Sequence, residues 1–132
     1  MADQAIQELN ATRRLSYGEQ LARSARKMPD ARALKFGDQE RNFREFDERV
    51  TRLANALAAR GVVKGDRVAT LAYNALEVVE TYMAASRLGA ICVPINFRLV
   101  ADEIVYIAGD SGAKALVAEV IRGTAAHLNP GG

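Results

Sequence analysis

The feature that most constrains this 132-residue chain is an alternation, over its second half, of short apolar runs with segments of helical periodicity. The apolar runs 67–73, 90–93 and 114–118 are expected to be strands, and the stretches 76–88 and 102–109 between them are expected to be helices. Strands connected through helices by short loops form right-handed βαβ units around a parallel sheet. The order of these segments therefore predicts an α/β fold.

Glycine and proline mark the expected ends of several elements. Gly61 and Gly89 each follow a helical pattern, at the position where a left-handed residue commonly closes a helix. Pro94 is expected to stop the strand 90–93, because proline has no amide to donate to a sheet.

Two capping patterns predict helices in the first half of the chain. Ser16 and Glu19 have the spacing of a capping box, so a helix is expected from there to Lys27. Asn42 and Glu45 repeat the pattern before a longer helix. The apolar residues of that helix fall on one face: Phe46, Val50, Leu53 and Leu57.

A β-hairpin is expected near residues 32–43. Residues 32–36 and 39–43 flank Gly37-Asp38, and a glycine at the first central position suits a two-residue type II′ turn. Without repeats or a linker rich in Pro, Gly or Ser, we expect a helical segment over 1–30, one α/β unit over 31–119 and a disordered tail over 120–132.

The overall charge is nearly balanced, with 18 basic and 16 acidic residues, which argues against nucleic acid as a partner. A basic excess is local, with seven basic against four acidic residues over residues 1–35. The single cysteine, Cys92, lies within an apolar run, so we expect a core residue in a reducing compartment. With no signal-peptide pattern and no run long enough to cross a bilayer, the expected location is the cytoplasm.

The sequence contains none of the motifs of a self-sufficient active site. It has no GxxxxGK[ST] loop, no GxGxxG between a strand and a helix, and no GxSxG. His127, the only histidine, stands in the tail far from Cys92, so neither a catalytic pair nor a metal site is indicated. We therefore assign no catalytic, cofactor-binding or metal-binding residue to this chain.

Three segments, in this order, resemble the amino-terminal part of AMP-forming acyl-CoA synthetases, members of the adenylate-forming superfamily. Residues 42–46 (NFREF) resemble the entry to the first helix of the family, and Gly65-Asp66-Arg67-Val68 with Asn74 resembles the family's GDRVAxxxxN. Residues 87–99 (RLGAICVPINFRL) resemble its KLGAVxVPINxRL, in the form found in acyl-CoA synthetases. The resemblance runs from about Asn42 to Val117 and implies the family's N-terminal subdomain.

The resemblance also implies an activity for the full-length enzyme. The family activates a carboxylic or fatty acid with ATP and Mg²⁺, releases pyrophosphate and transfers the acyl group from AMP to coenzyme A. Its phosphate loop, Tyr-Gly-x-Thr-Glu segment, ribose-binding aspartate and catalytic lysine have no counterpart in this sequence. We therefore expect roughly the first quarter of such an enzyme, inactive alone, with ATP, Mg²⁺ and coenzyme A serving only the full-length protein.

The segment after Pro94 has an expected structural role. Asn96 and Arg98 are expected to fix this loop by hydrogen bonds to backbone carbonyls or carboxylates, and Phe97 and Leu99 are expected to pack against other residues.

Two other functions stay open at this point. Uncovered apolar faces would suit a self-associating interaction module, with homo-oligomers as the partner state. The basic segment from Arg13 to Lys27 would suit a weak contact with a membrane surface, although only a thin apolar stripe accompanies it (Leu15, Leu21, Met28).

Overall fold

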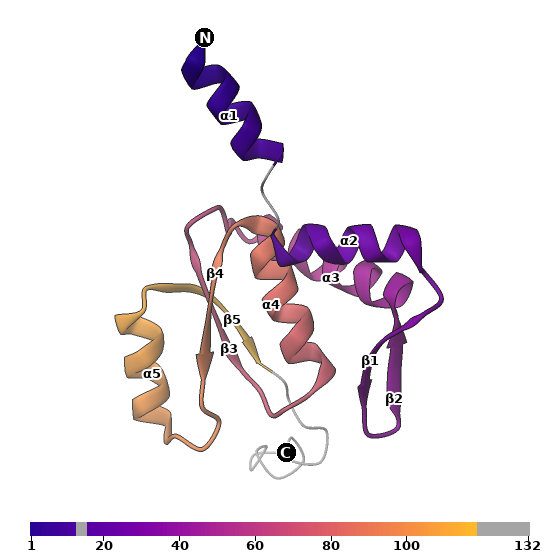
Figure 1. Ribbon diagram of the computed structural model, residues 1–132. Coiled ribbons are helices and arrows are strands. Elements are labelled where there is room, and N and C mark those ends of the chain that lie inside the picture. Colours follow the sequence, from indigo (N-terminus) through magenta and orange to yellow (C-terminus); the bar gives the residue numbers. More distant parts are fainter. Residues whose placement is uncertain (13–15, 119–132) are drawn as a thin grey trace.

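The computed structural model describes residues 1–12 and 16–118 (Figure 1). Helix α1 (Ala2–Thr12) lies apart from the remaining elements. These follow in the order α2 (Tyr17–Lys27), β1 (Arg32–Phe36), β2 (Gln39–Asn42), α3 (Phe43–Ala59), β3 (Arg67–Leu71), α4 (Leu76–Leu88), β4 (Ile91–Ile95), α5 (Ala101–Asp110) and β5 (Ala113–Ala118). No helix of the described part is long and apolar enough to cross a membrane.

Strands β3, β4 and β5 form a parallel sheet in the order β4-β3-β5. Helix α4 connects β3 to β4, and α5 then returns the chain across β3 to β5, so the two helices lie on opposite sides of the sheet (Figure 1). Val68 and Ala69 point to opposite faces of the central strand β3, and both are fully buried. The α/β fold with a parallel sheet is confirmed.

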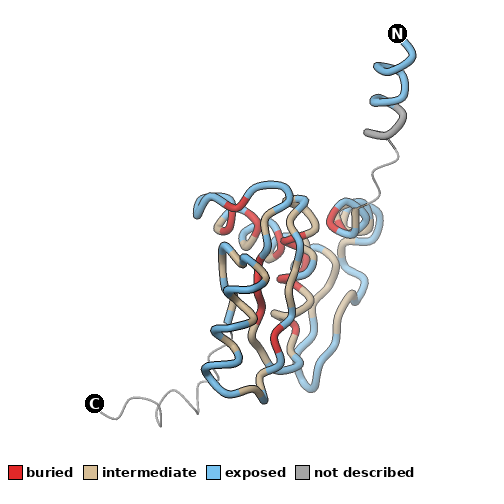
Figure 2. The backbone as a smooth tube through the Cα atoms, turned by 90° about the vertical axis from the view of Figure 1, so that its left-hand side faces the viewer, coloured by how far each residue is buried: buried red, intermediate tan, exposed pale blue. Residues whose placement is uncertain are grey.

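The hydrophobic core lies between this sheet and the layer formed by α2, α3 and α4. Its buried backbone segments run through the middle of the molecule (Figure 2). The core residues are Leu21, Phe46, Val50, Ala54, Leu57, Val62, Val68 and Ala84. Fully burying one aliphatic or aromatic side chain contributes roughly 1.5–3 kcal/mol, so each large residue of this cluster stabilises the fold.

Helix α3 begins and ends as its sequence predicts. The Asn42 side chain accepts a hydrogen bond from the Glu45 amide at 2.8 Å, and the Asn42 amide donates to the Glu45 carboxylate at 3.1 Å. At the other end Gly61 has a φ of +86°. Its amide donates to Ala58 and the next amide, Val62, donates to Leu57, which completes a Schellman motif.

The predicted hairpin is also present. Strands β1 and β2 pair antiparallel, with Phe36 opposite Gln39. Gly37 has a φ of +58°, and no residue other than glycine has a positive φ in the described part of the chain. The turn therefore fits type II′, which needs a positive φ only at its first central residue. Type I′ is excluded, because it needs a positive φ at both central residues.

Two predicted strand ends are wrong. Strand β3 ends at Leu71 rather than residue 73, and β4 continues through Pro94 to Ile95. Pro94 pairs with Thr70 and does not stop the strand. Because β4 is the outer strand of the sheet, a residue without an amide can lie there without breaking a second ladder.

Arg87 of α4 connects the three helices of the layer. Its guanidinium donates to the Gly18 carbonyl at 3.0 Å, to the Asp47 carboxylate at 2.7 Å and to the Thr51 hydroxyl at 2.7 Å. Gly18 lies so close to Arg87 that an added Cβ would stand 2.9 Å from the Arg87 Cβ. Since α2 also buries Leu21 in the core, it packs as part of this layer. The division at residue 30 stays a prediction.

Candidate functional site

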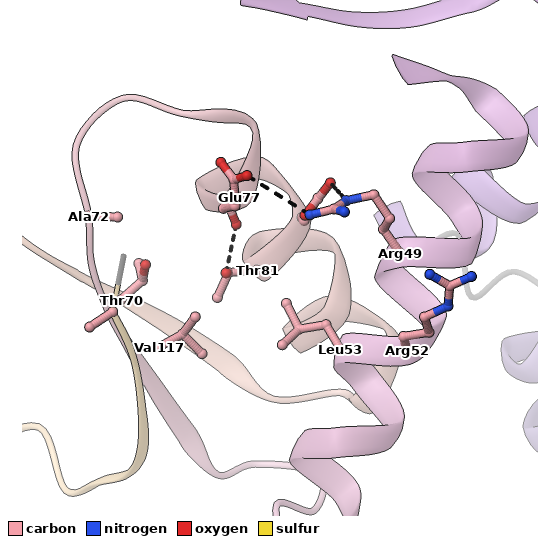
Figure 3. Close-up of a pocket in the computed structure, with 10 residues that line it drawn as sticks. Arg49, Arg52, Leu53, Thr70, Ala72, Glu77, Thr81 and Val117 are labelled. Atoms are coloured by element: carbon pink, nitrogen blue, oxygen red, sulfur yellow. Dashed lines mark hydrogen bonds and ion pairs between the residues drawn. The ribbon is translucent and has the colours of Figure 1, made fainter. Parts of the chain in front are cut away.

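A hollow of about 510 Å³ opens at the carboxyl ends of β3 and β5, between α3 and α4 (Figure 3). This is the edge of an open α/β sheet at which ligands commonly bind. Helix α3 contributes Arg49, Arg52 and Leu53, helix α4 contributes Glu77, Glu80 and Thr81, and the strand ends contribute Thr70, Ala72, Val117 and Ala118.

An ion pair between Arg49 and Glu80 forms the polar wall of the hollow. The Arg49 Nε donates to the Glu80 Oε1 at 2.5 Å, and the Glu80 side chain is only 5% exposed. The Glu77 carboxylate lies 3.9 Å from the same guanidinium. The hydrogen bond to Glu80 is the main reason why the pKa of Arg49 is raised above its ordinary value. The Nε of this guanidinium is thus already paired with a buried carboxylate.

Two threonines of the hollow differ in their hydrogen bonding. The Thr81 hydroxyl donates to the Glu77 carbonyl at 2.8 Å, within α4. The Thr70 hydroxyl is buried, and it has no hydrogen-bond partner in the described part of the chain. A buried polar group without a partner is rare and costs stability.

Thr70 also lines a second, smaller hollow of about 300 Å³ beside the carboxyl end of β4. The loop after Pro94 closes this side, and Phe97 stacks on Tyr73 with ring centroids 4.1 Å apart. Phe97 and Leu99 are both half-buried, in agreement with their expected packing.

The expected hydrogen bonds of this loop need correction. The Asn96 side chain accepts from the Arg98 backbone amide at 3.0 Å, and it donates to no carbonyl of the described residues. The Arg98 guanidinium lies 5.6 Å from the centre of the Phe97 ring, where a cation–π contact replaces the expected carboxylate. Asparagine forms such local turns readily, since its side chain reaches the amide two residues ahead.

The described residues contain no group of three or more side chains suited to a metal ion. Cys92 is half-buried, and burial raises its thiol pKa to about 11, which is opposite to the shift of a reactive cysteine. His127 and the predicted tail, residues 120–132, lie outside the described residues.

No sequence pattern noted above pointed to three central residues of the hollow: Arg49, Glu80 and Thr70. Glu80 could have been found, because it lies four residues after Leu76 and four before Ala84, on the inward stripe of α4. An acidic residue on a buried stripe requires a partner, and Arg49 follows Phe46 by one helical turn on the facing helix.

Comparison with known proteins agrees with this architecture. Residues 21–130 match the family described as AMP-binding enzyme. Feruloyl-CoA synthase of Amycolatopsis sp is 42% identical over 105 residues, which are 80% of this chain and 21% of that enzyme. A long-chain-fatty-acid–CoA ligase of Mycobacterium tuberculosis, FadD13, is 38% identical over 100 residues, or 72% of this chain and 20% of the ligase.

The fold has close counterparts among solved structures. A putative long-chain-fatty-acid CoA ligase from Rhodopseudomonas palustris aligns with a TM-score of 0.74 and 35% identity, covering 89% of this chain and 30% of that one. The chain thus spans only about a fifth of the length of the curated relatives it matches. With a family match over most of its residues, the chain belongs to the AMP-binding enzyme family, as part of its N-terminal domain.

Proposed function

We propose that this chain serves as the amino-terminal portion of an ATP-dependent acid–CoA ligase. In that reaction a carboxylate attacks the α-phosphate of ATP to give an acyl adenylate and pyrophosphate, and the coenzyme A thiol then displaces AMP. The observation that carries the proposal is the match of residues 21–130 to the AMP-binding family, together with relatives named as CoA synthases and ligases.

We further propose that the chain alone does not catalyse this reaction. Stabilising the transferred phosphate needs cations, hydroxyls and Mg²⁺ arranged around it. The sequence supports this proposal, because it holds no phosphate loop and no counterpart of the family's catalytic lysine. No catalytic step is therefore assigned to residues of this chain.

The contribution of this portion would be structural. The parallel sheet and the layer of α2, α3 and α4, which Arg87 connects, would support the nucleotide-binding part of the enzyme. A reducing compartment such as the cytoplasm suits its single half-buried thiol.

A chimera tests the proposal. Residues 16–118 would replace the matching segment of the Amycolatopsis feruloyl-CoA synthase, and formation of the CoA thioester would be followed. We expect activity from the chimera and none from the same enzyme with the segment deleted. A folded chimera without activity would show that this portion does not serve such an enzyme.

The two alternatives are tested separately. Self-association is supported by exposed apolar side chains on α5 and β5, among them Val105, Tyr106 and Leu116, and sedimentation velocity would detect it. For the membrane-surface alternative, Leu21 is already used by the core, which leaves less apolar surface for lipid. Co-sedimentation with anionic vesicles at low salt, lost at high salt, would support that alternative.

A further inference from the structure

We propose that the hollow between α3, α4 and the carboxyl ends of β3 and β5 docks a polypeptide segment from the remaining part of an AMP-binding enzyme. This inference rests on the proposed function. The segment would insert an apolar side chain and present a backbone carbonyl or amide to the Thr70 hydroxyl.

The Thr70 hydroxyl is the first observation. Thr70 lies next to the last residue of the central strand and is 3% exposed, and the described part of the chain gives its hydroxyl no partner. In Figure 3 it faces the same hollow as Thr81, whose hydroxyl is bonded. Since nearly all buried hydroxyls in proteins are hydrogen-bonded, a partner from another polypeptide segment would complete this one.

The walls of the hollow favour a polypeptide over a charged small molecule. Leu53, Val117 and Ala118 supply apolar surface. The two arginines and two glutamates of the lining balance in charge, so the hollow has no net positive charge to attract a phosphate or a free carboxylate. An apolar side chain with one neutral hydrogen-bonding group needs no counter-charge.

The position of β5 gives a third argument. It pairs only with β3 among the described strands, so its outer edge offers unpaired amides and carbonyls beside the hollow. The chain covers about a fifth of its relatives, and the other four-fifths of such an enzyme must pack somewhere on this unit. The hollow would take up the apolar side chain of the docked segment, and the adjoining edge of β5 would pair with its backbone.

Isosteric replacement of Thr70 by valine provides the test, in two contexts. In the isolated chain, Thr70→Val should raise the melting temperature by roughly 2–5 °C, because it removes an unpaired buried hydroxyl. In the chimera with feruloyl-CoA synthase, the same change should lower the melting temperature by a similar amount, because the docked segment loses its hydrogen bond. The matched control is Thr81→Val, which should lower both temperatures, since the Thr81 hydroxyl is bonded within α4 in either context.

Shifts of the same sign for Thr70→Val in both contexts would overturn the inference, even if the chimera makes the CoA thioester. An active chimera with shifts of the same sign would support the proposed function and contradict the docking inference. The failure of one is therefore distinguishable from the failure of the other. The inference would also be overturned if the isolated chain self-associates and Thr70→Val weakens that association. A second copy of the chain would then occupy the hollow.

If the chimera does not fold, the binding of two separate polypeptides is measured instead. The remaining four-fifths of the feruloyl-CoA synthase would be added to the labelled chain. Docking in the hollow is supported if Leu53→Arg weakens the affinity at least about tenfold while Thr81→Val leaves the affinity near its original value. Absence of binding, or equal affinity for Leu53→Arg, overturns it.

Discussion

Replacing Arg49 by methionine should destabilise the chain far more than replacing its partner Glu80 by glutamine. Arg49→Met leaves a carboxylate that is 5% exposed without its counter-charge, whereas Glu80→Gln leaves a guanidinium that is 38% exposed and still has Glu77 at 3.9 Å. The two halves of the ion pair are therefore not equivalent.

The magnitude follows from burial. Removing one partner of a fully buried ion pair costs about 3–5 kcal/mol. Because water reaches the Arg49 side of this pair, we expect about 2 kcal/mol for Arg49→Met and about 1 kcal/mol or less for Glu80→Gln. For a chain of this size, about 2 kcal/mol corresponds to a fall in melting temperature of roughly 8 °C.

The assay is urea unfolding followed by circular dichroism at 222 nm, since the sequence contains no tryptophan. The double variant Arg49→Met, Glu80→Leu should recover most of the lost stability, because it removes both charges and leaves apolar groups of similar size. A double variant no more stable than Arg49→Met alone, or a larger loss for Glu80→Gln than for Arg49→Met, would contradict this explanation of the pair.

Three further predictions concern other parts of the chain. Gly18→Ala should cost about 1–3 kcal/mol in urea unfolding, because the new Cβ would stand 2.9 Å from that of Arg87; an unchanged midpoint would refute the close approach. A hydrogen bond from the Val63 amide lowers the Asp66 pKa, so its stabilisation is present above the unfolded-state pKa and lost as pH falls through the folded-state value. Asp66→Asn should thus flatten the decline of melting temperature below about pH 4. An equally steep decline in the variant and the original chain would contradict this prediction. Cys92, with a pKa raised to about 11 by burial, should react with iodoacetamide at pH 8 about a hundredfold more slowly than in the urea-unfolded chain, and equal rates would contradict this.

The element order could be predicted from the sequence because its signals are local. The Asn42–Glu45 capping box, the glycine after α3 and the glycine turn of the hairpin each act within a few residues. Strand ends were less accurate, since Pro94 is tolerated only because β4 turned out to be an edge strand. That position in the sheet depends on which strands pair, which no local pattern determines.

The candidate site was invisible for the same reason. Arg49 and Glu80 are 31 residues apart and meet only when α3 packs on α4. The unpaired state of Thr70 depends on every residue around it, so its sequence neighbours could not reveal it. The loop after β4 begins one residue later than predicted, at Asn96, and its hydrogen bonds differ because the Asn96 side chain reaches the Arg98 amide two residues ahead.

ATP–pyrophosphate exchange would be measured on the isolated chain and on the chimera, with short, long and aromatic carboxylic acids. We expect no exchange above a blank for the isolated chain, and acid-dependent exchange for the chimera. Exchange by the repurified isolated chain with one class of acid would contradict this expectation, because a complete adenylation site would then exist within these 132 residues.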